Sequence, residues 1–427
     1  MSKLKSLIKA KLKNYPSFIK ISNYYRRRIV YVLAVLSGRE SYSKNMVTEQ
    51  CITGGSSWEH FFGYYDKSPW CRSGRYILTL EVKCASRNPK INEEAAIGLI
   101  DTENNYRFTM IGKTKIWNLQ QGCMLQWLGP DFESRIIYNN IINGRYVAVI
   151  YNIKTAETAV LGRPIYTVSG DGRRALSLNF SRLHRLRPGY GYLNLKDNTA
   201  SEKIPSGDGI WMMDVEKNRA RLLLSIKDAA GIKPDPGMEN TNHWFNHLEF
   251  NPDGERFSFI HRWNVNNKIY SRLFTSDLNG KGIYCLADDQ LVSHCCWKNS
   301  KQLLSWARVG CEGDHYYLFT DLSKKHTIIG KDNLNEDGHP SYSPDGRYIL
   351  TDTYPDKLRM RRLILYDTYT DKKYELGRYF APFKYDFEYR CDLHPRWSRD
   401  GKIICFDSAH EGKRQMYIVL NPLIKRS

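Results

Sequence analysis

The chain has 427 residues, including 29 tyrosines and 10 tryptophans, and a formal net charge of +19. This length allows two or three average domains or one long all-β unit, and the many aromatic residues favour half-buried sheets. The ten cysteines form no CxxC pair, which argues against a zinc ribbon or a thioredoxin-type site. Several lie in apolar runs, so we expect buried, reduced thiols and a cytoplasmic location.

The first 50 residues are predicted to form a basic, helical extension. Residues 1–45 contain 11 basic residues and a single acidic one, Glu40. Lysines alternate with Leu and Ile from Lys3 to Lys20, and Arg26–Arg28 precede an apolar run that is too short to span a bilayer. The segment predicts peripheral binding to the inner face of an anionic membrane or, equally, a tail or a helix packed on the domain.

Residues 51–427 contain two sequence elements that recur seven times in the same order. The first is a tight polar turn followed by an apolar strand, as in Ser343-Pro-Asp-Gly-Arg-Tyr-Ile-Leu. The second is an apolar strand ending in Asp or Asn, as in Leu363-Ile-Leu-Tyr-Asp. The turns recur about every 55 residues, which is a spacing typical of four-stranded propeller blades. The sequence therefore predicts an all-β fold, a seven-bladed β-propeller.

One gap between successive turns is longer than the others and holds an insertion from about Arg182 to Gly209. It is rich in arginine and tyrosine. A long loop on a rigid scaffold often carries function, although a plain surface loop is the alternative.

The innermost strand of each blade lines the central channel, and here it precedes the polar turn. Histidines occur at or near the start of this strand in five of the seven predicted blades. We therefore expect residues distant in sequence to meet at one mouth of the channel. The candidates are His60, Tyr64, Tyr65, Gln121, His243, His247, His294, His339, Arg390, Asp392, His394 and Arg396.

Such a ring can bind a divalent metal, supply an acid and a base, and hold a carboxylate between arginines. These are the requirements of β-elimination at a uronate sugar, where the carboxylate charge must be neutralised before a base removes the neighbouring proton.

At these positions the chain resembles the oligogalacturonate lyases, seven-bladed propellers related to TolB-like and WD40-like repeats. The likeness is carried by His394-Pro-Arg-Trp, Trp244-Phe-Asn-His247, Ser293-His294 and Gly338-His339. The resemblance implies cleavage of uronate oligosaccharides with a divalent metal, usually manganese.

The metal ligands of that family, three histidines and one glutamine, are matched in part. His294 and His394 match two of them, whereas Arg396 and Cys391 occupy the other two positions. Two alternatives follow. A cation such as Mn²⁺ or Ca²⁺ is held differently, with His339 or Asp392, or no metal binds and Arg396 supplies the positive charge. We favour the second, because a fixed cation beside two imidazoles discourages another.

We therefore predict a polysaccharide lyase-like enzyme whose partner is an acidic oligo- or polysaccharide. His247 is the expected base and Tyr65 or His339 the acid, with Arg390 and Arg396 on the carboxylate. The alternative is a non-catalytic propeller that binds glycan or acts as a scaffold in cell-envelope polysaccharide assembly. A serine hydrolase is disfavoured because no Gly-x-Ser-x-Gly motif occurs, and no nucleic-acid module is present. Further substrate contacts are expected from His60, Gln121, Arg182, Arg187, Tyr190, His243 and Asp392.

Overall fold

The computed structural model describes the helix Pro16–Leu36, residues 45–266 and residues 268–424. Side chains of the helix are described from Tyr25 onward. The first part of the predicted basic helix, which contains Lys3 to Lys13, lies outside the described residues.

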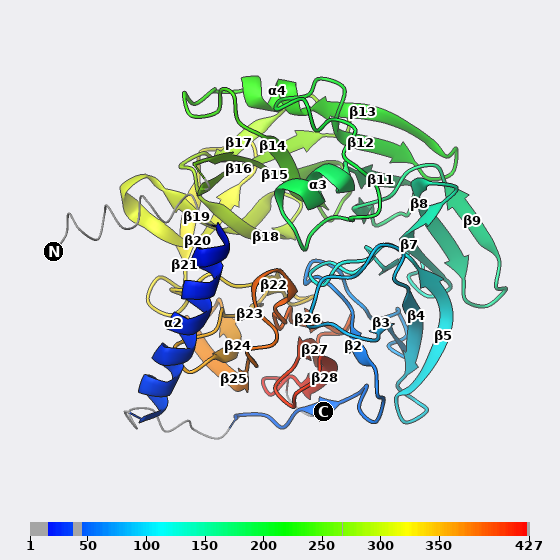
Figure 1. Ribbon diagram of the computed structural model, residues 1–427, viewed down its shortest axis with the longest axis vertical. Coiled ribbons are helices and arrows are strands. Elements are labelled where there is room, and N and C mark those ends of the chain that lie inside the picture. The colour runs from blue at the N-terminus through cyan, green and yellow to red at the C-terminus, as the bar shows by residue number, and fades with distance from the viewer. Residues whose placement is uncertain (1–15, 37–44, 267, 425–427) are drawn as a thin grey trace.

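Seven four-stranded antiparallel sheets are arranged radially around one axis, which confirms the predicted seven-bladed β-propeller (Figure 1). In the first six blades the strands follow one another in sequence from the axis outward. The first four blades comprise β2 (Glu59–Phe61), β3 (Tyr76–Val82), β4 (Ala95–Asp101) and β5 (Arg107–Thr114); β6 (Gln126–Trp127), β7 (Arg135–Ile142), β8 (Arg145–Asn152) and β9 (Thr158–Leu161); β10 (Thr167–Val168), β11 (Arg174–Ser177), β12 (Gly209–Asp214) and β13 (Arg219–Ser225); and β14 (His243–Phe250), β15 (Arg256–Val265), β16 (Lys268–Asp277) and β17 (Tyr284–Ala287).

The seventh blade differs from the others because it takes its outermost strand from the other end of the chain. Strand β1 pairs with β28, with Gln50 opposite Ile418 and Cys51 opposite Tyr417. The ring is therefore closed by hydrogen bonds between sequence-distant strands. The last three blades comprise β18 (Val292–Asn299), β19 (Gln302–Val309), β20 (Gly313–Thr320) and β21 (His326–Ile329); β22 (Ser341–Tyr342), β23 (Tyr348–Asp352), β24 (Met360–Asp367) and β25 (Lys372–Phe380); and β26 (Arg396–Trp397), β27 (Ile403–Ser408), β28 (Gln415–Leu420) and β1 (Gln50–Cys51).

The recurring polar turns connect the first and second strands of a blade. In the sixth blade the Ser343 hydroxyl accepts the N–H of Tyr348 at 2.9 Å, and Asp345 accepts the N–H of Arg347 at 3.1 Å. Gly346 has a φ of +71°, a conformation that L-residues with side chains disfavour. The serine, aspartate and glycine of the motif are thus each explained by turn geometry. Equivalent bonds recur at Ser169–Arg174 and Ser398–Ile403.

Apolar side chains fill the spaces between neighbouring blades. Between the fifth and sixth blades, for example, Leu304 packs with Ile349 and Ile364, each at most 5% exposed. This packing fixes the angle between blades, and hence the position of each inner strand around the channel.

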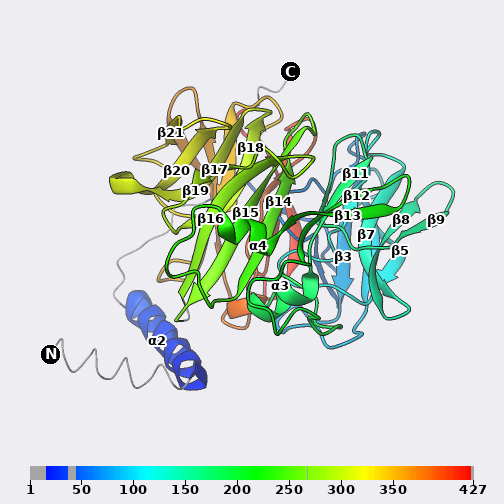
Figure 2. The same cartoon turned by 90° about the horizontal axis from the view of Figure 1, so that it is seen from above.

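Both the insertion and the N-terminal helix lie at the end of the ring where the inner strands begin. The insertion joins β11 to β12 and contains helix α3 (Phe180–Leu186), capped by the Asn179 side chain, which accepts the N–H of Arg182. Helix α2 (Pro16–Leu36) lies on the same face (Figure 2). We call it the mouth face. The remaining short helices are α4 (Ile226–Gly231), η1 (Gly310–Glu312) and η2 (Phe387–Tyr389).

None of the helices in the described part of the chain has the length and apolar character needed to cross a bilayer. All ten cysteines are free thiols, and six of them are buried.

Candidate functional site

Four histidines and one tyrosine meet on the channel axis near the mouth face. His247 and His294 lie on β14 and β18, whereas His339 and His394 precede β22 and β26. The ring centroids of His294 and His339 are 4.2 Å apart, and those of His339 and His394 are 4.4 Å apart. The Tyr64 ring lies 4.9–6.4 Å from all four imidazoles. We call these five residues the histidine cluster; they come from five different blades.

The backbone at two cluster residues is held in the left-handed region. His247 and His394 have φ values of +53° and +43°. Such conformations cost about 1–3 kcal/mol each in residues other than glycine, so surrounding bonds must enforce them. The N–H of His247 donates to the hydroxyl of Tyr166 at 3.0 Å, and the N–H of His394 donates to Asp352 at 3.2 Å.

Asp352, at the end of β23, joins two neighbouring blades. One carboxylate oxygen accepts both the N–H and the Nδ1–H of His339, at 2.9 and 2.7 Å. The other oxygen accepts the N–H groups of Leu393 and His394. Nδ1 of His394 donates to the Gly63 carbonyl at 2.8 Å. The Nδ1 atoms of both imidazoles are therefore occupied, and their Nε2 atoms face the channel without a hydrogen-bond partner.

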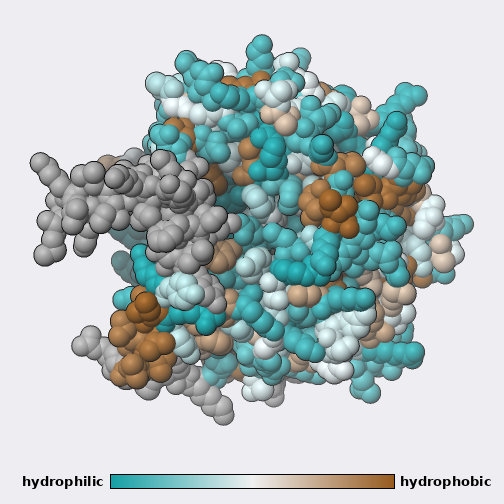
Figure 3. Space-filling view, viewed as in Figure 1, coloured by the Kyte–Doolittle hydropathy of each residue, from teal (hydrophilic) through white to brown (hydrophobic). Residues whose placement is uncertain are grey.

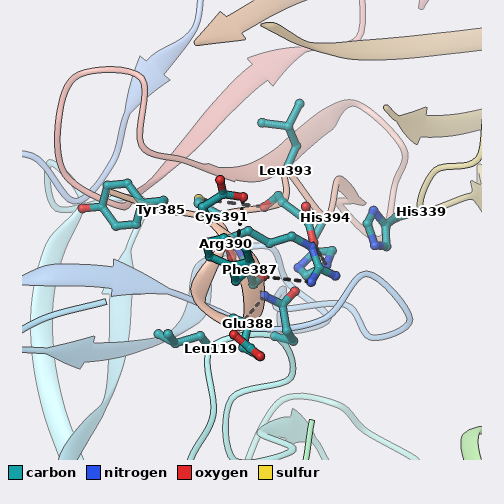
Figure 4. Close-up of polar contacts among 12 residues, drawn as sticks. Leu119, His339, Tyr385, Phe387, Glu388, Arg390, Cys391, Leu393 and His394 are labelled. Atoms are coloured by element: carbon teal, nitrogen blue, oxygen red, sulfur yellow. Dashed lines mark hydrogen bonds and ion pairs between the residues drawn. The ribbon is translucent and has the colours of Figure 1, made fainter. Parts of the chain in front are cut away.

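Asp392 is the carboxylate beside these two free nitrogens. Its oxygens lie 2.7 Å from Arg361 and 2.6 Å from Arg390, and 3.9 Å from Nε2 of His394. Burial raises the pKa of this carboxyl, but the two guanidinium groups outweigh burial and hold the pKa well below its usual range. Figure 4 shows Arg390 and His394 on the segment before β26, with His339 reaching in from the neighbouring blade.

Among the described residues, His339, Asp392 and His394 form a group whose ligand atoms lie close enough to hold one metal ion. The donor set suits a divalent transition metal, because two Nε2 lone pairs and a carboxylate converge while the Nδ1–H groups are anchored by acceptors. This grouping contains His394, one of the two predicted metal ligands, together with His339 and Asp392, the two residues expected as possible replacements. His294, the other predicted metal ligand, is not part of this group, although its Nδ1 is likewise anchored, 3.0 Å from Asp337.

Protonation divides the cluster. Burial and the neighbouring His294 hold the pKa of His247 well below its usual value, and burial with His339 does the same for His394. Burial also opposes the charged form of His339, but the charge of Asp352 and its hydrogen bond raise the pKa of His339 above the usual value. The pKa values of neighbouring imidazoles are thus shifted in opposite directions.

The insertion brings Tyr190 to the mouth. Its hydroxyl accepts a hydrogen bond from Arg390 at 2.8 Å, and the guanidinium of Arg187 lies 5.1 Å from the ring centroid. Burial raises the pKa of this phenol, but Arg390 and Arg187 outweigh it and lower the pKa to about 8. A cavity of about 770 Å³ opens here, lined by Arg187, Tyr190, Tyr354, Arg361 and Arg390 and, on its far side, by helix α2.

Two predicted site residues are engaged within the protein. The Tyr65 ring packs against the cluster, 5.7 Å from the ring of His294 and 5.3 Å from that of His339. Tyr65 accepts the N–H of Cys295 and donates to its carbonyl, at 3.0 and 2.9 Å, so its hydroxyl is committed to the backbone. Arg396 is 1% exposed and bonds Asp407 at 2.6 Å. Its guanidinium is therefore buried and paired, while its charge still acts on His394 and contributes to the lowered pKa of that imidazole.

The other predicted contacts are also engaged within the protein. His60 bonds Gln415, and His243 bonds His261 at 2.9 Å. Gln121 contacts the cluster indirectly. It donates a hydrogen bond to the Tyr166 hydroxyl, which in turn accepts the N–H of His247. The buried guanidinium of Arg182 donates to four backbone carbonyls, those of His243, Thr199, Glu202 and Lys203.

Sequence reasoning missed the residues that support the cluster from the second and third strands of a blade. Asp352 ends β23, Arg361 lies on β24 and Arg262 lies on β15. Arg262 is buried and bonds Asn246. The one available signal was a charged residue within an otherwise apolar strand run, as in Ile-Leu-Thr-Asp352.

The sequence matches no protein-family model and no curated protein. Solved structures do resemble the chain. An oligogalacturonate lyase from Vibrio parahaemolyticus aligns at 13% identity and a TM-score of 0.63, covering 90% of this chain and 96% of that one. An oligogalacturonate lyase in complex with manganese aligns at 14% identity and a TM-score of 0.65, with the same coverage. The likeness to TolB from Acinetobacter baumannii is looser, with a TM-score of 0.40.

These similarities confirm the resemblance to oligogalacturonate lyase-type propellers at the level of the fold, over nearly the whole of the chain.

Proposed function

We propose that the protein is a lyase-type propeller that cleaves a uronate-containing glycan by β-elimination at the mouth face. The observation that carries the proposal is the histidine cluster, in which four imidazoles with pKa values shifted in opposite directions meet beside a cavity rich in arginine. The similarity to oligogalacturonate lyases supports it.

In the proposed reaction His247 is the base. Its imidazole is neutral at physiological pH, and Nε2 lies 3.4 Å from the Tyr64 hydroxyl. The base takes the proton from the carbon next to the sugar carboxylate, a carbon–carbon double bond forms, and the bond to the glycosidic oxygen breaks. His339 then gives its Nε2 proton to that oxygen. Arg390 and Arg187 bind the carboxylate and stabilise the charge that develops on it.

A divalent cation would be held by His339, Asp392 and His394, and it would neutralise the sugar carboxylate. Since that arrangement occupies Nε2 of His339, the proton for the leaving oxygen would come from Tyr190, whose pKa of about 8 suits this role at neutral pH. Manganese is the ion bound in one of the similar lyases.

The test is incubation with a panel of uronate oligosaccharides, with added Mn²⁺ or Ca²⁺ or with a chelator, while the ultraviolet absorbance of the unsaturated product is followed. We expect His247→Asn to lower kcat about 10²–10⁴-fold. His326→Asn is the matched control, because His326 lies on an outer strand. Absence of product across the panel under every metal condition excludes the enzyme.

A binding-only role is the second candidate, and the burial of the cluster favours it. The four imidazoles are at most 5% exposed. A propeller that holds an acidic glycan at the mouth, for example as a scaffold in envelope polysaccharide assembly, needs the arginines of the cavity and not the imidazoles. It would bind the same oligosaccharides without forming product, and His247→Asn would leave that binding unchanged.

The free cysteines support a reducing, cytoplasmic location.

A further inference from the structure

Helix α2 is attached to the propeller by one of its faces. Arg27 bonds Asp386 at 2.6 Å, and the Tyr31 ring lies 5.4 Å from the ring of Phe383, edge to face. Arg27 and Tyr31 are four residues apart and therefore lie on the same side of the helix. The helix is thus fixed beside the cavity at the mouth, and its Val30 lines that cavity.

The opposite face of α2 is apolar and uncovered. Ile29, Val32, Leu33 and Leu36 share this side by their helical spacing. Their exposed fractions are 59%, 50%, 60% and 77%. Figure 3 shows the resulting apolar surface on α2, set against a largely hydrophilic mouth face. We call these four residues the outer face of α2. A contiguous apolar surface of this kind marks a site of interaction.

The charge of the surrounding sequence identifies the partner. Residues 1–45 carry 11 basic residues and one acidic residue. Apolar side chains beside a strong basic excess are the features of a helix that lies in the plane of an anionic lipid surface. A second copy of the chain would bring the same positive charge to the contact, which disfavours self-association.

We propose that the outer face of α2 docks the protein on an anionic lipid bilayer, with the mouth face turned towards the lipid. Ile29, Leu33 and Leu36 enter the interface between head groups and acyl chains, while neighbouring basic side chains contact the head groups. Arg27 and Tyr31 keep the propeller attached to the docked helix.

Docking in this orientation places the cavity at the bilayer, because α2 forms one wall of the cavity. It favours a glycan attached to the membrane over one free in solution. This corollary rests on the proposed function, whereas lipid binding is measured without it, so the two can fail separately.

The experiment is co-sedimentation of the full chain with vesicles of phosphatidylcholine alone and of phosphatidylcholine mixed with phosphatidylglycerol. We expect binding to the mixed vesicles that weakens as salt is raised. The variant Ile29→Ser/Leu33→Ser/Leu36→Ser should lower partitioning at least about tenfold. Leu322→Ser should bind as the unmodified chain does, because Leu322 is 58% exposed but lies in the β20–β21 turn, at the end of the ring away from the mouth.

Circular dichroism and thermal unfolding verify that the propeller of each variant is intact. The proposal is wrong if the chain ignores anionic vesicles, if neutral vesicles bind it equally well, or if the triple variant partitions as the unmodified chain does. It is also wrong if the chain forms a dimer without lipid and the triple variant is a monomer, since the outer face then binds a second copy.

Discussion

At the scale of single residues, two acidic side chains near the channel have pKa values shifted in opposite directions. Asp392 is ionised because the guanidinium groups of Arg361 and Arg390 lie against it and outweigh its burial. Glu249, further along β14, has no such set of donors. Burial, with a smaller contribution from Asp66, raises the pKa of Glu249 to about 8.

This raised pKa gives a pH dependence with a defined sign. The folded chain retains the Glu249 proton at a pH where the unfolded chain has lost it, so the stabilisation is complete below about pH 4.5 and is lost as the pH rises to about 8. Glu249→Gln should remove a loss of at most about 1.4 kcal/mol per pH unit across that window.

The measurement is denaturant unfolding of both proteins from pH 5 to pH 8. Glu255→Gln is the control, since Glu255 is exposed in the neighbouring turn. Parallel stability curves for the unmodified chain and Glu249→Gln would contradict the assignment.

The positions of the imidazoles could be predicted from sequence, whereas their partners could not. His247, His294, His339 and His394 share one place in the repeat, and a repeat fixes where equivalent residues meet. Tyr64 and Tyr65 both pack against the cluster, but the hydroxyl of Tyr65 bonds the backbone of Cys295, a partner that composition does not reveal. Asp352 and Arg361 reach the site through the register between strands and between blades, for which the sequence carries no direct signal.

At the scale of elements, the insertion between β11 and β12 is organised by one side chain. The buried Arg182 guanidinium donates to four backbone carbonyls, three of which belong to the insertion. The arginine and tyrosine residues of this insertion therefore have two different roles. Arg182 holds the loop together, and Arg187 and Tyr190 are carried by the loop to the mouth.

Arg182→Met should loosen this insertion without unfolding the blades, because the carbonyls left in the protein interior lose their donors. We expect faster proteolytic cleavage between residues 187 and 208, with the main unfolding transition little changed. Arg185→Met is the matched control on the same helix, where the side chain is 32% exposed and bonds Asp197. Cleavage of Arg182→Met at the rate of the unmodified chain would show that Arg182 does not hold the loop.

At the scale of the whole molecule, the ring depends on the pairing of β1 with β28. The N–H of Ile52, directly after β1, donates to the Met416 carbonyl at 2.9 Å, and the Ile52 side chain is 3% exposed. This short segment is the part of the seventh blade that the other end of the chain supplies.

Ile52→Pro should therefore destabilise the whole propeller by about 3 kcal/mol or more, because it removes the donor and disturbs the pairing. Ile52→Val retains the donor and should cost about 0.5–1.5 kcal/mol. Denaturant unfolding followed by circular dichroism compares the two. If their free energies of unfolding agree, the side chain alone accounts for the contribution of this segment.

Asp352 links this closure to the chemistry of the channel. The carboxylate belongs to the sixth blade, yet it fixes the backbone of Leu393 and His394 at the start of the seventh. The distance between the imidazoles of His339 and His394 therefore depends on the position of the seventh blade relative to the sixth. A change far out on the rim, where β1 joins that sheet, can disable the centre while most of the blades keep their form.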